Sequence, residues 1–124
     1  MKTTATERLD QALLSTGFPP DVRGQEQSLD WWRYFSYHAR SLRRTGSTAI
    51  NLAWLAAGRF DGYYAFDNHV WDVAGGVVLV REAGGILSNA DGSPYDPYSA
   101  DALASNGPLH PALLAAMRSD PRAV

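Results

Sequence analysis

Asp72 is the residue of this sequence whose type and position are best suited to chemistry. It precedes an apolar run, residues 73–80, that is followed by Gly84 and Gly85. Aspartate is a preferred N-cap and glycine a common helix stop, so the pattern predicts a helix with Asp72 at its head. A carboxylate there lies beside free backbone N–H groups, where an anion, or a cation held near one, can bind. Asp72 can also be simply a cap, and the local pattern by itself favours that interpretation.

A second candidate segment is formed by Gly46, Ser47 and Thr48, which precede another apolar run at residues 49–57. These three residues predict a helix start with free N–H groups and hydroxyls, which suits an anion or a polyol. Ordinary helix capping is the simpler alternative for the same residues.

Carboxylates are the remaining source of catalytic chemistry. Asp67 and Asp72 lie in one loop-to-helix segment. Carboxylate oxygens are typical ligands of Mg²⁺, together with substrate phosphate and water, although one aspartate is a weak metal signal by itself. The three histidines lack metal-ligand spacing, and the sequence has no P-loop and no nucleophile elbow.

The flanking sequence predicts how these residues are positioned. Aromatic residues at helical spacing predict a helix over residues 30–42, capped by Ser28 or Asp30, with an aromatic face in the core. The central helix is apolar on almost every face, which predicts burial from several sides. Strands are expected within residues 11–18, 63–66, 86–88 and 103–105, and a last helix within 111–118. The alternation of strands and helices predicts a single-domain, layered α/β fold, with residues 1–8 disordered.

Length and composition narrow the class of protein. With 124 residues, 11 basic and 13 acidic side chains and a net charge of −2, the chain has no basic patch, so nucleic acid is not an expected partner. The absence of cysteine excludes disulfides and zinc–thiolate sites and fits a cytoplasmic location. No membrane association is expected, because the longest apolar run is far shorter than the roughly 20 residues of a membrane span.

Four motifs resemble the C-terminal half of the inositol monophosphatase family, in order as well as in content. They are G-S-T-A at residues 46–49, A-A-G-R-F-D-G-Y-Y at 56–64, W-D-V-A-G-G at 71–76 and R-E-A-G-G at 81–85. The resemblance implies an αβαβα layered phosphomonoesterase that uses Mg²⁺ to hydrolyse a small alcohol or sugar phosphate, such as an inositol phosphate. It implies that Asp72 binds metal and approaches the ester oxygen. It also implies that Gly46, Ser47 and Thr48 contact the alcohol part of the substrate, with His69 beside them.

Two departures from the family pattern modify this expectation. Ala65 stands where inositol-specific members carry a glutamate that binds inositol hydroxyls, which puts an inositol preference in doubt. The family's first metal motif, D-P-x-D-G-T, and its upstream glutamate are absent, and multi-metal phosphoryl transfer needs several carboxylates. We therefore expect a truncated phosphatase, inactive as an isolated chain. The alternative is a non-catalytic remnant, or a binding half that assembles with a separately encoded N-terminal half or as a homodimer.

Overall fold

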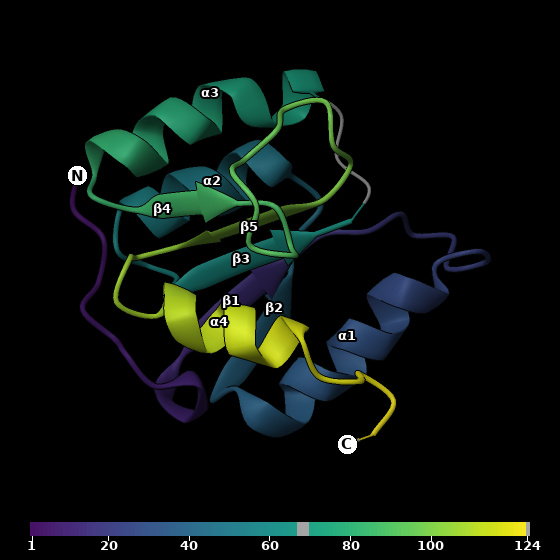
Figure 1. Ribbon diagram of the computed structural model, residues 1–124. Coiled ribbons are helices and arrows are strands. Elements are labelled where there is room, and N and C mark those ends of the chain that lie inside the picture. The colour runs from purple at the N-terminus through teal and green to yellow at the C-terminus, as the bar shows by residue number, and fades with distance from the viewer. Residues whose placement is uncertain (67–69, 124) are drawn as a thin grey trace.

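A five-stranded mixed sheet forms the middle layer of the computed structural model, which describes residues 1–66 and 70–123 (Figure 1). Its strands are β1 (Leu13–Thr16), β2 (Ser41–Arg44), β3 (Gly62–Ala65), β4 (Ile86–Ser88) and β5 (Ala102–Ser105). The strand order is β2-β1-β3-β5-β4, with β1, β2 and β3 parallel and β5 antiparallel to both of its neighbours. The predicted layered α/β fold is confirmed.

Two pairs of helices cover the two faces of this sheet (Figure 1). They are α1 (Glu26–His38) and α4 (His110–Met117) on one face, and α2 (Thr48–Ala56) and α3 (Val70–Glu82) on the other; a short 3-10 helix, Leu9–Gln11, precedes β1. Strand side chains alternate between two cores, so Tyr63 packs with α2 and α3 whereas Tyr64 packs with α1 and α4. Within the described ranges, no helix is long and apolar enough to cross a membrane.

Helix α1 and strand β2 replace the single helix predicted over residues 30–42. α1 begins at Glu26, soon after Gly24, whose φ of +75° belongs to the preceding turn. Its N-cap, Gln25, makes no side-chain capping hydrogen bond, and the Ser28 hydroxyl lies inside the helix, where it donates to Oε1 of Gln25. The predicted caps are therefore wrong. Residues 41–44 form β2 because they pair with β1. The local sequence of this basic segment does not show that pairing, because it depends on a contact with a distant part of the chain.

The central helix α3 also differs from its prediction. It begins at Val70, so Asp72 is the third residue of the first turn rather than the N-cap. One face of the helix is buried, with Val73, Val77 and Val80 in the core. The opposite face is exposed and carries Ala74, Gly75 and Val78. The expected burial from several sides is wrong for this chain because α2 and the sheet cover the helix from one side only.

The exposed side of the α2–α3 pair is apolar. It consists of Ala49, Ile50 and Trp54 on α2 and of Ala74, Gly75 and Val78 on α3, which we call the α2–α3 outer face. Ile50, Trp54 and Val78 are 44%, 40% and 59% exposed. Among the described residues of the two helices, exposed charged side chains occur only at the C-terminal end of α3. A helix surface that faces water normally carries polar residues, so this face has the character of an interface.

The N-terminal segment runs past the amino ends of the parallel strands and is hydrogen-bonded there. The Thr3 N–H donates to the carbonyl oxygen of Ala83 over 3.2 Å, and the Thr4 hydroxyl donates to the Asp61 carboxylate. The side-chain amide of Asn106 donates to Oγ1 of Thr4 and to the carbonyl oxygen of Thr6. Residues 1–8 contain no helix or strand. The buried residues Asp61 and Asn106 supply hydrogen-bond partners to this segment.

A buried histidine links β4, β5 and α4. His110 is 5% exposed; its Nε2 lies 2.9 Å from the Ser88 hydroxyl on β4, and its Nδ1 lies 2.8 Å from the Ser105 hydroxyl on β5. The Ser88 hydroxyl donates to the Asn89 carbonyl oxygen, and Ser105 Oγ accepts the Gly107 N–H. A neutral ring with its proton on Nε2 satisfies this network. Burial lowers the pKa of His110 from its ordinary value of 6.5.

The free energy of unfolding is therefore expected to fall as the pH drops below about 6.5. In that range the unfolded chain binds a proton at His110 that the folded protein binds only near its own, lower pKa. Stability is thus full above 6.5 and declines toward that lower pKa. Urea unfolding at a series of pH values measures the loss. His110→Gln should abolish the loss of stability at low pH, whereas His38→Gln, at an exposed position, should keep it. If the stability of His110→Gln depends on pH as the wild type does, His110 is not the group responsible.

Candidate functional site

The carboxyl ends of the parallel strands bring the predicted site residues to one edge of the sheet. Because β1, β2 and β3 are parallel, the segments that follow them leave from the same edge. The chain after β2 leads into α2, and the chain after β3 leads into α3, so both helices start there. Open α/β sheets bind ligands at this carboxyl edge. Gly46, Ser47, Thr48 and Asp72 belong to these two helix starts, whereas His69 lies outside the described residues.

The start of α2 is held by hydrogen bonds within the protein. Ser47 is its N-cap, and the Ser47 hydroxyl oxygen accepts the Ile50 N–H over 3.2 Å. The Thr48 hydroxyl oxygen accepts a hydrogen bond of 3.4 Å from the hydroxyl of Tyr63 on β3. Gly46 faces open space, since a Cβ built there would meet no atom within 4 Å. The loop therefore presents backbone at Gly46 while the neighbouring hydroxyls hold the helix start in place.

Asp72 is the acidic residue that the sequence places at this edge. It lies in the first turn of α3, where free N–H groups and the helix dipole favour negative charge. The placement of its side chain, and Asp67 as a whole, lie outside the described part. Across the residues whose placement is described, no group of three or more His, Asp or Glu side chains is close enough together to hold a metal ion. Because Mg²⁺ takes several oxygen ligands, these residues alone do not make a complete magnesium site.

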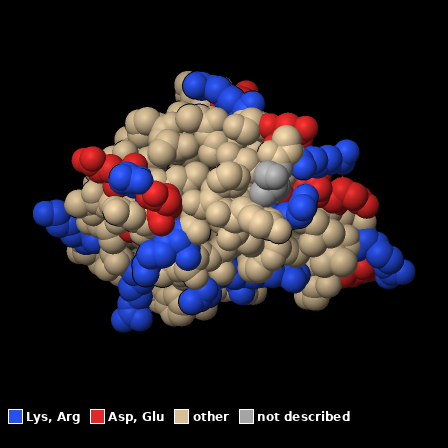
Figure 2. Space-filling model, turned by 90° about the horizontal axis from the view of Figure 1, so that it is seen from below, with Lys and Arg blue, Asp and Glu red and all other residues tan. Residues whose placement is uncertain are grey.

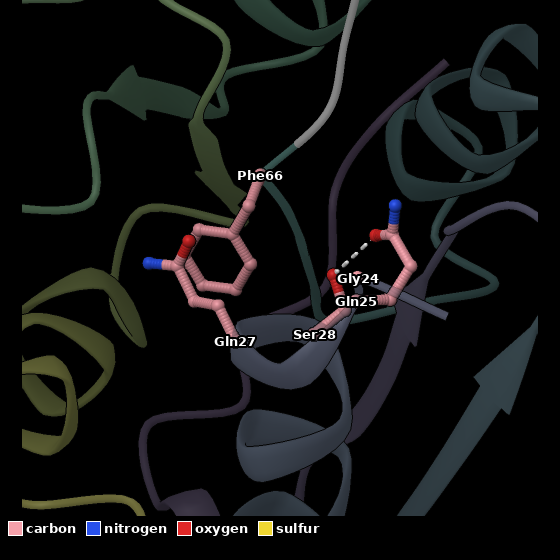
Figure 3. A pocket seen from close by; sticks show the side chains of 5 residues that line it. All are labelled: Gly24, Gln25, Gln27, Ser28 and Phe66. Atoms are coloured by element: carbon pink, nitrogen blue, oxygen red, sulfur yellow. Dashed lines mark hydrogen bonds between the residues drawn. The ribbon is translucent and has the colours of Figure 1, made fainter. Parts of the chain in front are cut away.

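A small pocket lies between the start of α1 and the end of β3, where sequence reasoning indicated no site. Its volume is about 110 Å³, and it is lined by Gly24, Gln25, Gln27, Ser28 and Phe66. Figure 3 shows the Gln27 amide next to the Phe66 ring on one side, and the Ser28–Gln25 hydrogen bond of 3.4 Å on the other. The pocket contains none of the predicted site residues. Its lining carries no charged side chain, so it does not suit a phosphate group.

Polar side chains are also buried beneath the carboxyl edge, and sequence reasoning missed them. Ser15 Oγ on β1 and Asn51 Nδ2 on α2 have no hydrogen-bond partner among the described residues. The available signal for Asn51 is its position as a polar residue inside the apolar run of residues 49–57. In the opposite core, burial raises the pKa of the Tyr64 hydroxyl, which therefore stays neutral.

The face formed by α1 and α4 carries mixed charge. Figure 2 shows Lys and Arg side chains interspersed with Asp and Glu around this face. Exposed ion pairs in the described part join Arg8 to Asp10, Arg23 to Asp21 and Arg122 to Asp30, at 2.7, 2.6 and 3.0 Å. Pairs of this kind contribute little stability. The mixture leaves no broad region of one sign in this view that would direct a charged ligand.

The strand order and the two helix starts define a layered α/β protein whose predicted site residues follow the carboxyl ends of two of its three parallel strands. The model of the inositol monophosphatase family matches residues 1–122. The chain belongs to the inositol monophosphatase family.

Individual relatives show how much of the family protein this chain represents. Inositol-1-monophosphatase of Synechocystis sp. is 40% identical over 123 residues, which cover 98% of this chain and 43% of that protein. The Nus factor SuhB of Escherichia coli (strain K12) is 38% identical over 116 residues, covering 90% of this chain and 42% of that protein. The structure of inositol monophosphatase from Anabaena (Nostoc) sp. matches with a TM-score of 0.93 and 35% identity, over 99% of this chain and 50% of that one. The chain therefore spans about half the length of these relatives.

Proposed function

We propose that this chain supplies the substrate-facing half of a magnesium-dependent phosphomonoesterase site that hydrolyses a small alcohol or sugar phosphate. The observation that supports the proposal is the placement of two helix starts, α2 with Gly46 and α3 with Asp72, at one edge of the parallel strands. Helix starts offer free N–H groups and a positive dipole end, which favour a phosphate anion. Both starts carry the family's motif residues.

Each site residue has its own role in this proposal. Asp72 binds Mg²⁺ and approaches the ester oxygen of the substrate. Gly46, Ser47 and Thr48 contact the alcohol part, and the resemblance to the family adds His69 as a further substrate-binding residue. When bound, magnesium would neutralise phosphate charge and polarise the ester. The residues of this chain orient the substrate so that the ester oxygen faces Asp72.

Ala65 bears on the choice of substrate. It is the last residue of β3 and is 2% exposed. Its methyl group cannot accept a hydrogen bond from a substrate hydroxyl, whereas a carboxylate at this position could. We therefore propose the broader class of small alcohol and sugar phosphates rather than inositol phosphate alone.

The number of acidic ligands determines how the chain can act. Asp72 is the one residue that the resemblance assigns to metal here, and the D-P-x-D-G-T motif is absent from the sequence. The remaining carboxylates have to come from another polypeptide segment, so we propose that the 124-residue chain alone is inactive. A non-catalytic binding half is the second candidate. It is favoured by one observation, that a relative 38% identical over 116 residues is a Nus factor.

Phosphate release from myo-inositol 1-phosphate and glycerol 2-phosphate tests the proposal in the presence of Mg²⁺. The chain alone should be inactive, and the chain joined to the N-terminal half of the Synechocystis relative should hydrolyse both esters. In the joined protein, Asp72→Asn should lower kcat/KM by about a hundredfold or more, because a metal ligand is lost. Asp10→Asn, at an exposed position, is the matched control. A folded joined protein without activity, or full activity in Asp72→Asn, would refute the proposal.

A further inference from the structure

Asn51 is a wholly buried polar residue in the first turns of α2, with an exposed fraction of 0%. Its side-chain oxygen Oδ1 accepts a hydrogen bond of 2.9 Å from the hydroxyl of Thr45. Its Nδ2 has no acceptor among the described residues. An apolar side chain of similar size would avoid this unpaired donor, so the presence of the amide needs an explanation.

Thr45 connects this amide to the loop before α2. Its hydroxyl oxygen accepts the Ser47 N–H at 3.4 Å, and the hydroxyl also lies 3.2 Å from the Ser47 carbonyl oxygen. The Thr45 backbone N–H donates to the carbonyl oxygen of Thr16, the last residue of β1. The single hydroxyl of Thr45 thus joins the buried face of α2 to the backbone of Ser47, directly after Gly46.

The loops that follow β1 and β2 meet above Asn51. A Cβ built on Gly17, directly after β1, would lie 3.9 Å from Nδ2 of Asn51 and 3.5 Å from the Thr45 carbonyl oxygen. The amide therefore lies beneath the point where the two loops come together at the carboxyl edge. The Ser15 hydroxyl is also buried without a hydrogen-bond partner in the described part; it lies on β1, outside the loop at residues 45–47.

We propose that Asn51 is a positioning residue that acts through the Thr45 hydroxyl to hold the backbone of Gly46 and Ser47 in place at the ligand edge. It does not contact substrate itself. The catalytic consequence rests on the proposed phosphatase function, whereas the effect on the loop is a property of this chain alone. The hydrogen bond of the amide oxygen to Thr45 therefore explains why this buried position carries an amide, in spite of its unpaired Nδ2.

Amide NMR tests the link without any assay of activity, on the 124-residue chain carrying Trp54→Lys and Val78→Lys so that the α2–α3 outer face does not drive association. Asn51→Leu and Thr45→Val should each shift the amide resonances of Gly46 and Ser47 and speed their hydrogen exchange by about tenfold, and the double variant should do no more than either alone. Thr45→Ser keeps the hydroxyl and should keep the wild-type values. Ser15→Ala, which removes another buried unpartnered hydroxyl, is the matched control. If Asn51→Leu does not fold, the Thr45→Val and Thr45→Ser pair tests the same link.

Kinetics of the joined protein provide the second measurement. Loss of loop positioning should raise KM for the phosphate ester about tenfold and leave kcat within about threefold, since ground-state and transition-state binding weaken together. Unchanged loop amides in both Asn51→Leu and Thr45→Val, or the same changes in Thr45→Ser and Ser15→Ala, would overturn the inference. If the joined protein is inactive, the proposed function fails while the amide measurement still decides the role of Asn51.

Discussion

Replacing Gly76 with alanine is expected to destabilise the protein by about 2–3 kcal/mol, whereas the same change at Gly75 should stabilise it by about 0.5–1 kcal/mol. A Cβ built on Gly76 would lie 2.5 Å from Cδ1 and 2.6 Å from Cβ of Leu52 on α2. The Cδ1 atom can rotate away but the Cβ cannot, so α2 and α3 would have to separate. A Cβ on Gly75 meets no atom within 4 Å, and alanine has the higher helix propensity.

Urea unfolding followed by circular dichroism measures both effects, at low protein concentration so that association does not contribute. The two variants have identical composition, so opposite signs can come only from position. Adding Leu52→Ala to Gly76→Ala should recover only part of the loss, because the Leu52 Cβ remains. Equal effects at the two glycines would show that α2 and α3 do not pack this closely.

Association through the α2–α3 outer face is the second large effect that we expect of the isolated chain. The face exposes Ile50, Trp54 and Val78, and the charged group that contacts one of them is the Arg59 guanidinium, 5.8 Å from the centre of the Trp54 ring. Covering about 400 Å² of such surface is worth on the order of 10 kcal/mol at roughly 25 cal/mol per Å², before the cost of association. The chain should therefore dimerise, aggregate or remain partly molten unless another polypeptide segment covers this face.

Light scattering over a range of concentrations, with a dye that binds exposed apolar surface, tests this expectation. Val78→Lys and Trp54→Lys should lower the apparent mass and the dye signal. Tyr37→Lys is the matched control, because Tyr37 is 68% exposed on α1, away from this face. A wild-type chain that is a monodisperse monomer, binds no dye and unfolds in one sharp transition would show that the face needs no partner.

The elements that the sequence predicted well are those whose local signals agree with their tertiary surroundings. Helix α2 follows a serine cap and ends before Gly58, whose φ is +78°, and strand β3 follows a turn. The aromatic face of α1 is core, as expected, with Trp31 and Phe35 buried. Strand β2 was not predictable, because it lies at the edge of the sheet and its partly exposed, basic residues follow no apolar pattern.

The same distinction, between features that local sequence predicts and features that depend on tertiary contacts, applies to the candidate site. The Ser47 cap could be read from the sequence because it depends on atoms three residues apart. At the opposite end of the sheet, the role of Asp61 could not be read in this way: its carboxylate accepts the Leu13 N–H over 2.7 Å, 48 residues away in the chain, and an Asp-Gly pair by itself signals only a turn. Asn51 is similar, since its partner hydroxyl on Thr45 and the loop of Gly17 meet it only in the folded protein.

The place of β5 in the sheet constrains the order in which the chain can fold. β5 follows the other four strands in the sequence, yet it lies between β3 and β4, so β4 has no neighbouring strand in this sheet until residues 102–105 are available. The contact between residues 4 and 106 also forms late, because Asn106 donates to the Thr4 hydroxyl across a separation of 102 residues. Contacts of such long separation cost loop-closure entropy before they contribute energy, and they form slowly. As the chain is synthesised, β1, β2 and β3 can therefore pair early, whereas the sheet is complete only once residues 102–105 are available.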